Sequence, residues 1–323
     1  NYPFLIFTHR QPMKDIFTLS ILGISFGFSF SVIKVLAGYP DIEMMAIGGS
    51  TLVALILIST FKQKDIRVKK LLTKNKAKFF LVCGVSSFLF PLSLEFMVLE
   101  TLDIGLVSIV VSTAPIFGVM FFLMSGAQRV NPGVVISVLI GLLACLLALY
   151  SKGALNSIFS DSVSAGDDFS MNLPLLVAIP VSYGFYHFYV DVKWPKGLHP
   201  NELAVGELFI CSLLSMVIVM LHGFNLEPVD LTWVMMTGLL GCLTAIEALL
   251  YFNLQAKKGA IFCSFSDYIA TITGVVLGAV LFDESTSALV VLALALVILA
   301  AWFANSHSHR QPTSEVSVDP EVV

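Results

Sequence analysis

Acidic side chains interrupt segments of this sequence that are otherwise almost wholly apolar. Glu247 lies in LLGCLTAIEALLYFNLQ, residues 239–255, and Asp267 lies in the next apolar segment. Two carboxyl groups inside a membrane could bind a substrate amine or exchange protons. Alternatively, such a carboxyl group is protonated and only joins neighbouring helices by a hydrogen bond. We take both acids as candidate binding or coupling residues.

Aromatic and imidazole groups accompany these acids. His187 lies in SYGFYHFYVDV, and Tyr183 and Tyr186 share one helical face with it through i, i+3 and i+4 spacing. Tyr251 lies one turn beyond the glutamate at 247. Rings beside carboxylates favour a cationic or zwitterionic amine through Coulomb and cation–π attraction. The alternative is that the rings face lipid.

Three further ionisable side chains lie away from the middle of their segments. At about 1.5 Å per residue, Lys34 and Glu95 lie roughly 10 Å from the membrane centre on the outer side and could pair. Alternatively, Lys34 extends to the outer headgroups and Glu95 hydrogen-bonds locally. Glu207 lies nearer the inner mouth and is a weaker candidate for the same site.

The composition indicates the medium in which these groups must be positioned. The 323 residues are 57% hydrophobic and 12% charged, and the mean hydropathy is +0.91. Soluble domains carry about 25% charged residues. We therefore predict an all-α integral membrane protein in contact with the lipid bilayer. The net charge of −4 identifies no partner, and nothing in the sequence suggests nucleic-acid binding.

Ten apolar segments approach the roughly 20 residues that a helix needs to cross a bilayer. They are 16–37, 42–61, 79–98, 104–124, 132–150, 173–192, 202–221, 231–254, 260–281 and 287–304. Lysine and arginine stay on the cytoplasmic side of a membrane. With a cytoplasmic N-terminus, all 18 basic residues except Lys34 and Lys152 fall inside or near the inner face. We predict ten transmembrane helices in the cytoplasmic (inner) membrane, with both termini cytoplasmic.

The two halves of the chain show weak internal similarity. A shift of about 156 residues pairs Leu94 with Leu250 and Gly118 with Gly274. The shift equals five spans, so the second copy would enter the membrane in the opposite orientation. Two five-helix inverted-topology repeats suit alternating access around a site near the midplane. The same shift pairs Glu247 with Pro91, which predicts a site that differs between the halves.

Three stretches of the sequence carry a recognisable pattern: FSFSVIKVL (28–36), VSTAPIFGVMFFL (111–123) and GAVLFDESTSALVVLALALVILAAW (278–302). They resemble the EamA-type permeases of the drug/metabolite transporter superfamily. The resemblance covers about residues 15–304 as two family repeats. It implies a ten-helix carrier for a small metabolite, often an amino acid or a related compound, and commonly an exporter.

The boundaries of the regions follow from the spans and the repeat. The expected division is a cytoplasmic N-terminal extension at 1–14, a first five-helix repeat at 15–150, an extracytoplasmic linker at 151–171, a second five-helix repeat at 172–304 and a disordered cytoplasmic tail at 305–323. No cofactor is expected. Substrate and protons are the expected small partners.

Prolines and glycines predict where helices break or approach closely. Pro91, Pro115 and Pro180 lie near the middle of spans, where they free backbone carbonyls and permit kinks that can line a cavity. Gly274, Gly278 and Gly118 supply small faces for close helix packing.

Other function classes remain open. The sequence holds no HExxH, GxSxG or Walker A motif, which disfavours a membrane-embedded enzyme. The sequence is also compatible with a passive channel, an importer or a subunit without transport activity of its own. The five cysteines all lie within spans and lack CxxC spacing, so neither a disulfide nor a metal site is expected.

Overall fold

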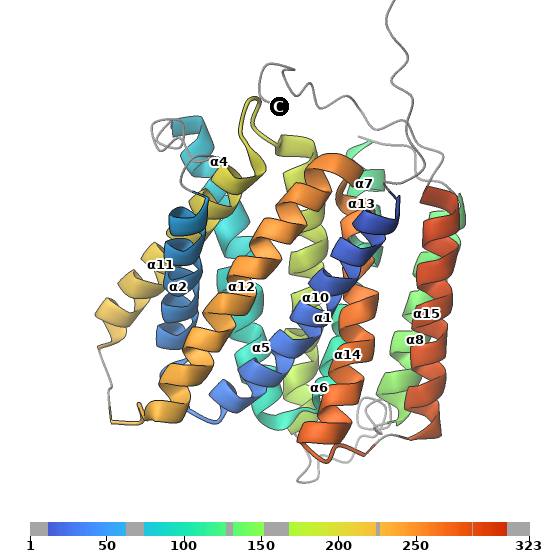
Figure 1. The fold of residues 1–323 in the computed structure, drawn as a ribbon. Helices are drawn as coiled ribbons and strands as arrows, with labels where there is room; N and C mark the ends of the chain where they lie inside the picture. The colour runs from blue at the N-terminus through green and yellow to red at the C-terminus, as the bar shows by residue number, and fades with distance from the viewer. Residues whose placement is uncertain are drawn as a thin grey trace, which may run out of the picture.

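The computed structural model describes six stretches of the chain, and the regular structure in them is helical (Figure 1). The described residues are 12–62, 74–126, 132–151, 168–223, 227–285 and 287–308. The predicted terminal tail from 309 onward, residues 1–11 and most of the predicted linker lie outside these ranges.

The helices follow the predicted apolar segments in order. They are α1 (Pro12–Ala37), α2 (Glu43–Phe61), α4 (Lys74–Gly84), the π-helical segment η2 (Val85–Leu89), α5 (Phe90–Thr101), α6 (Ile104–Val111), α7 (Ala114–Ser125), α8 (Pro132–Ser151), α10 (Asp168–Lys193), α11 (Pro200–His222), α12 (Leu231–Lys258), α13 (Ala260–Cys263), α14 (Ser266–Leu281) and α15 (Ala288–Ser308).

Seven helical segments within the described chain are long and apolar enough to cross a membrane. Three shorter apolar helices, Val135–Ala148, Ser266–Leu281 and Ala288–Ala300, lie where three further spans are predicted. The all-helical membrane architecture is therefore confirmed, whereas the count of ten spans stays a prediction.

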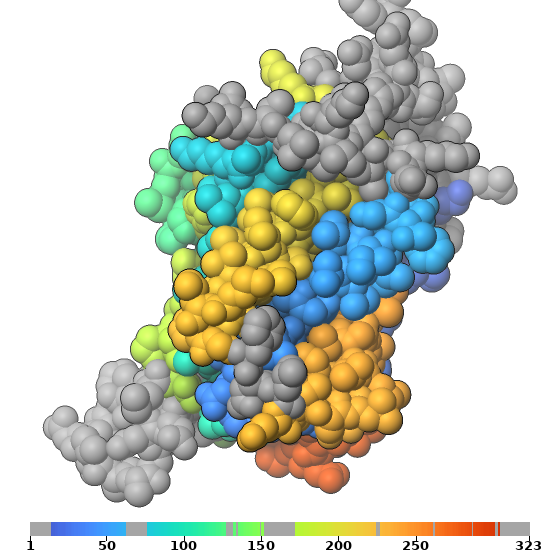
Figure 2. All heavy atoms as spheres, turned by 90° about the vertical axis from the view of Figure 1, so that its left-hand side faces the viewer, coloured from blue at the N-terminus to red at the C-terminus, as the bar shows by residue number. Residues whose placement is uncertain are grey.

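Large apolar side chains cover the outer surface of the bundle. Figure 2 shows α2 and α11 side by side on one face. Leu52 and Ile56 of α2 and Phe209, Leu213, Met216 and Met220 of α11 are all exposed. Soluble monomers rarely expose apolar surface on this scale, whereas lipid-facing helices do.

Three of the helical segments are interrupted, one of them between α13 and α14. The π-helical η2 precedes Pro91 at the start of α5, and Ser112 and Thr113 separate α6 from α7, where Pro115 lies in the first turn. These interruptions agree with two of the three predicted proline sites. The third proline, Pro180, lies inside the continuous helix α10, so the helix does not break there, and the kink that this proline permits stays a prediction. A proline removes only one helical hydrogen bond, and neighbouring groups can compensate for it.

The η2 segment shows how such compensation works. The N–H of Phe90 donates to the carbonyl of Val85, which is the π-helical pattern. The next donor in that register would be Pro91, which has no N–H. The hydroxyl of Ser182 on α10 donates instead to the carbonyl of Ser86, at 2.8 Å. This bond ties α10 to the interrupted helix beside the centre of the bundle.

Glycines allow two pairs of helices to touch along their backbones. A Cβ atom at Gly23 of α1 would lie 2.7 Å from the Ser266 carbonyl oxygen and 2.5 Å from the Ile269 Cβ of α14. A Cβ atom at Gly184 of α10 would lie 2.7 Å from the Ala114 carbonyl oxygen of α7. Such distances are shorter than side chains accept, so both positions require glycine.

Polar contacts at one end of the bundle join segments that are predicted to be cytoplasmic. Lys258 and Asp15 form an ion pair at 3.1 Å, and the Ala260 N–H donates to Asp191 at 3.3 Å. The start of α1 and the end of α15 lie at this same end in Figure 1. This grouping agrees with the prediction that the basic segments lie on one side of the membrane. The assignment of that side to the cytoplasm stays a prediction.

A hydrogen-bonded cap joins two elements at the opposite end. Asp230 accepts from the Trp233 N–H at 2.7 Å and from the Tyr39 hydroxyl at 2.9 Å. These bonds hold the pKa of Asp230 below its ordinary value. The carboxylate caps the start of α12, where the helix dipole favours a negative charge.

Candidate functional site

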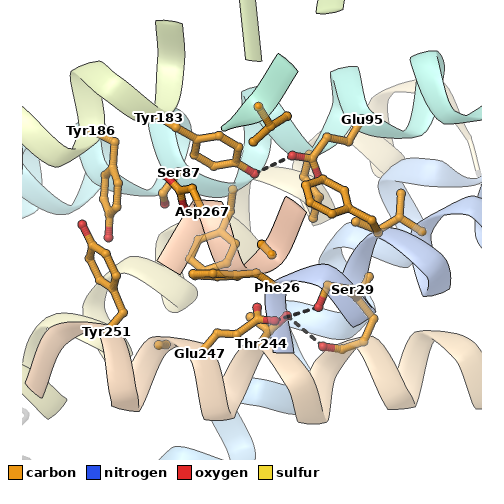
Figure 3. Close-up of a pocket in the computed structure, with 18 of the residues that line it drawn as sticks. Phe26, Ser29, Ser87, Glu95, Tyr183, Tyr186, Thr244, Glu247, Tyr251 and Asp267 are labelled. Atoms are coloured by element: carbon orange, nitrogen blue, oxygen red, sulfur yellow. Dashed lines mark hydrogen bonds between the residues drawn. The ribbon is translucent and has the colours of Figure 1, made fainter. Parts of the chain in front are cut away.

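A cavity of about 120 Å³ lies in the centre of the bundle, between α1, α5, α6, α10, α12 and α14 (Figure 3). Most of the residues predicted to bind or couple line it. They are Glu95, Tyr183, Tyr186, His187, Glu247, Tyr251 and Asp267. The lining also contains the residues Phe26, Ser29, Ser87 and Thr244, which the sequence did not single out.

Glu247 enters the cavity from α12 and is held by the facing helix α1. One carboxyl oxygen, Oε1, accepts hydrogen bonds from Ser25 at 3.0 Å and from Ser29 at 2.7 Å. The residue is only 6% exposed. The two serines are spaced i, i+4, so they lie on one face of α1, which is a signal that the sequence contained.

Glu95 enters from α5 and accepts a hydrogen bond from the Tyr183 hydroxyl of α10 at 2.8 Å. Lys34 lies elsewhere: its ammonium group donates to the carbonyl of Leu102, at the end of α5, at 2.7 Å. The predicted Lys34–Glu95 pair is therefore wrong. A freed carbonyl at a helix end satisfies the lysine, and a tyrosine hydroxyl satisfies the glutamate.

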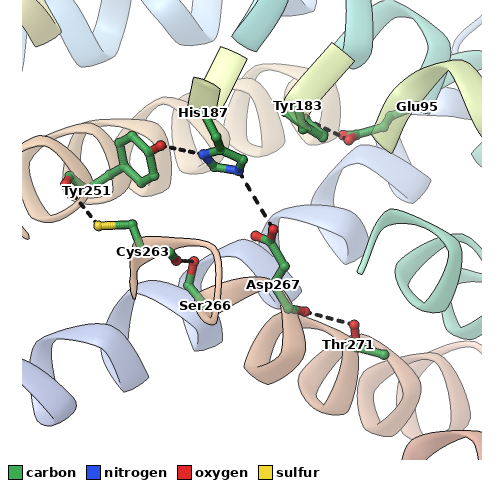
Figure 4. A network of polar contacts seen from close by, with 8 residues as sticks. All are labelled: Glu95, Tyr183, His187, Tyr251, Cys263, Ser266, Asp267 and Thr271. Atoms are coloured by element: carbon green, nitrogen blue, oxygen red, sulfur yellow. Dashed lines mark hydrogen bonds and ion pairs between the residues drawn. The ribbon is translucent and has the colours of Figure 1, made fainter. Parts of the chain in front are cut away.

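His187 connects Tyr251 with Asp267 (Figure 4). The imidazole Nδ1 is hydrogen-bonded to the Tyr251 hydroxyl, and Nε2 lies 3.8 Å from Asp267 Oδ2. That distance is too long for a hydrogen bond but suits an ion pair when the imidazole is protonated. Asp267 Oδ2 is buried and has no hydrogen-bond partner among the described residues.

The backbone near Asp267 is arranged for a negative charge. The residue lies in the first turn of α14, immediately after the interruption between α13 and α14. The N-terminal end of a helix carries partial positive charge and unpaired N–H groups. Unlike the other two interruptions, this one has no proline in its first turn, and sequence inspection therefore missed it.

Glu207 differs from the other acids because it is outside the cavity lining. Glu207 lies on α11 and is fully buried. Its carboxyl group is hydrogen-bonded to Ser87 of η2 and to Tyr186, the latter at 3.2 Å. Tyr186 in turn stacks on Tyr251, with ring centroids 5.9 Å apart. We assign Glu207 a positioning role: it holds the η2 segment and the wall of the cavity.

Two of the three predicted packing glycines do approach a neighbouring helix. A Cβ at Gly274 would lie 2.9 Å from Ser108 Cβ of α6, so α14 and α6 are in close contact there. At Gly118, a Cβ would meet the Gly184 carbonyl oxygen at an ordinary 3.6 Å. In the contact between α7 and α10, the glycine that a Cβ atom would disturb is therefore Gly184 and not Gly118.

Gly278 has a different role from the predicted helix packing. A Cβ atom there would collide with the carboxyl group of Glu284, which lies in the turn after α14. That carboxyl group accepts from the Ile104 N–H at 2.7 Å and from the Gly105 N–H at 3.1 Å. Glu284 therefore caps the start of α6, and Gly278 provides the space for it.

The described residues contain no group of three or more His, Cys, Asp or Glu side chains that could hold a metal ion. The cysteines are free: Cys83, Cys145, Cys211 and Cys263 are buried, and Cys242 is exposed on the outer surface.

Comparisons with known proteins connect the chain to a transporter family. Residues 13–150 match the model of the EamA-like transporter family, so the resemblance seen in the sequence is confirmed over the first predicted repeat. One solved crystal structure is similar over 90% of this chain and 98% of its own, with a TM-score of 0.62 at 15% identity. That likeness shows a shared fold along nearly the whole chain. No curated protein matches the sequence.

Proposed function

We propose that this multi-pass membrane protein, whose residues 13–150 match the EamA-like transporter family, is a secondary carrier that moves a small amine-bearing metabolite by alternating access. The observation that carries the proposal is the central cavity, in which three carboxyl groups and several aromatic rings gather from helices of both halves. Ionisable groups are costly inside a membrane, so their convergence on one cavity is the expected mark of a substrate or proton path.

Contacts between the helices support two inverted repeats as the architecture. Helix α1 touches α14 as α10 touches α7, each through a glycine. A shift of 152 residues takes the contacted residues Ala114 and Phe117 to Ser266 and Ile269. Such reciprocal contacts are what an inverted repeat of five helices produces.

A second pair of contacts follows the same rule. A Cβ at Gly84 would meet the Glu207 carbonyl oxygen at 3.1 Å, and a Cβ at Gly241 would meet the Ser50 carbonyl oxygen at 2.7 Å. One shift of 157 residues relates all four positions. The α4–α11 contact and the α12–α2 contact are therefore equivalent under the proposed repeat.

The contacts give two shifts: 152 relates α7 to α14, and 157 relates the contacting glycines of the two spans that also carry Glu95 and Glu247. A shift of 152 pairs Glu247 with Glu95, a shift of 157 pairs it with Phe90, and the sequence shift of 156 pairs it with Pro91. Both glutamates line the cavity, and each accepts hydroxyl hydrogen bonds from the first helix of a repeat, α1 or α10. We propose Glu95 and Glu247 as equivalent acids of the two repeats.

Glu247 and Asp267 are the proposed binding and coupling residues. Each can hold either a proton or the ammonium group of a substrate, so loading one releases the other. Exchange of this kind would couple substrate movement to the proton gradient. His187, in contact with Tyr251 and near Asp267, is the neighbouring group able to accept or supply a proton.

The direction proposed is export from the cytoplasm across the inner membrane, and the proposed cargo is an amine-bearing metabolite, a class that includes amino acids and related amines. Both follow from the family resemblance. Cells that overproduce the protein should accumulate one or more such metabolites in the medium, and cells producing Glu247→Gln at the same level should not. Depletion of a metabolite from the medium would indicate import and contradict the direction.

Counterflow separates a carrier from a channel or an enzyme. Liposomes that contain the protein and are loaded with unlabelled metabolite should take up labelled metabolite transiently above its equilibrium level. The reason is that a carrier that has released labelled metabolite inside the liposome reorients faster when it binds unlabelled metabolite than when it is empty. If the rate of uptake does not depend on metabolite on the opposite side, the protein is a passive facilitator. If the metabolite is chemically altered, the protein is an enzyme.

A further inference from the structure

The cavity is acidic without a matching fixed positive charge. Glu95, Glu247 and Asp267 line it, and His187 is the one basic side chain among the described lining residues. Lys34, the nearest candidate by sequence, donates to the Leu102 carbonyl outside the lining. Any cation that balances these acids must therefore come from the substrate or from protons.

Each acid has an oxygen left over for a ligand. Glu95 accepts from Tyr183 through Oε1, and Glu247 accepts from the α1 serines through Oε1. The hydrogen bonds that these two glutamates accept thus reach Oε1, and the Oε2 atom of each is open to a ligand. Asp267 Oδ2 is in addition buried without a hydrogen-bond partner among the described residues. A buried acceptor of this kind requires a donor from outside the protein chain.

The acids approach from different sides, with aromatic surface between them. In Figure 3, Glu95 and Glu247 reach into the cavity from opposite walls, and the ring of Phe26 lies between them. Aromatic rings favour cations over their faces and also accept apolar methylene groups. The site therefore suits an apolar chain with a positive charge at each end.

An amino acid would leave one group without a partner in this cavity. Its ammonium group could bind an acid, but its carboxylate would face three acids and one imidazole that is already bonded to Tyr251. A buried charge without an opposite charge is strongly disfavoured. Selection against the carboxylate is thus a consequence of the lining.

From these features we infer that the substrate is a small organic cation with two amino groups and no carboxylate, bound between Glu95 and Glu247. This inference rests on the proposed carrier function and narrows its substrate class. Two carboxyl groups that each exchange a proton for an ammonium group would balance the charge of such a dication.

The matched probes are 1,5-diaminopentane and lysine, which differ only in the carboxylate. In counterflow with reconstituted protein, we expect the diamine to exchange at least about tenfold faster than lysine. 1-Aminopentane, which lacks the second ammonium group, should also exchange at least about tenfold more slowly than the diamine. Each tenfold ratio corresponds to about 1.4 kcal/mol.

Two variants on one helix test the position of the site. Glu95→Gln should lower diamine exchange at least about tenfold, whereas Glu100→Gln, an exposed residue on the same helix α5, should leave it unchanged. Thermal unfolding in detergent, with and without the diamine, is measured on the same samples. A diamine-induced rise in the unfolding temperature of the wild type should be lost in Glu95→Gln.

The contradicting outcomes can be told apart. Lysine or 1-aminopentane exchanging as fast as the diamine would overturn the inference and leave the carrier function standing. The same holds if neither diamine nor lysine exchanges but another metabolite shows counterflow. If no metabolite from the culture medium shows counterflow either, the proposed function itself fails.

Discussion

Glu247→Gln is expected to reduce substrate exchange by about a hundredfold or more, close to the background of protein-free liposomes. The amide is the same size as the carboxyl group, and its carbonyl oxygen can still accept from Ser25 and Ser29. The change therefore removes the charge and the exchangeable proton while it keeps the helix contact. A hundredfold loss corresponds to about 2.7 kcal/mol, within the range of a screened charge pair in a protein.

Initial rates of counterflow, measured over a range of pH, test this expectation. Glu100→Gln on the exposed surface serves as the control for removal of a carboxyl group, and thermal unfolding verifies that the variant is folded. Exchange by Glu247→Gln that equals the wild-type rate at every pH would refute the role of Glu247. If Glu247 only stabilised the fold, Glu247→Gln would instead unfold at a lower temperature than the wild type and would exchange substrate at the wild-type rate below that temperature.

Gly184→Ala is expected to be among the most damaging single-methyl changes in the described part of the bundle. Its Cβ atom would lie 2.6 Å from Phe117 Cβ, 2.7 Å from the Ala114 carbonyl oxygen and 2.7 Å from the Gly118 nitrogen. Two of these are backbone atoms, so α10 and α7 must separate to relieve the clash. Overpacking of this kind costs about 1–3 kcal/mol, and we expect the upper part of that range.

Gly238→Ala is the matched control, because a Cβ atom at Gly238 of α12 meets nothing within 4 Å. Alanine there should be neutral or stabilising, since glycine inside a helix costs up to about 1 kcal/mol relative to alanine. Thermal unfolding of both variants in one detergent gives the comparison. Equal unfolding temperatures for Gly184→Ala and the wild type would mean that the two helices are not in backbone contact.

Much of the site was predictable because charge inside an apolar segment is conspicuous. Glu247, Asp267 and His187 stood out by residue type alone, and the structure places all three on one cavity. Their partners Ser25 and Ser29 were not singled out, because serine is common in membrane helices and its role depends on the helix opposite.

Pairing between helices was the part that sequence could not determine. Lys34 and Glu95 lie at similar depth, but depth does not specify rotation about the helix axis, and each found another partner. The repeat shift was ambiguous for the same reason. Apolar sequence of low complexity aligns almost as well one helical turn away, and the backbone contacts give a shift of 152 between α7 and α14 but 157 between Gly84 and Gly241.

Access to the cavity from both sides of the membrane is the central claim, and a cysteine at Thr244 tests it most directly. Thr244 lines the cavity and is close to cysteine in size, while the native Cys242 faces outward. The measurement is the labelling of Thr244→Cys in oriented vesicles by a charged, membrane-impermeant thiol reagent, added to one side at a time, with wild-type protein as background. We predict labelling from either side, and protection when substrate is present. Labelling from one side only, whatever the substrate conditions, would contradict alternating access.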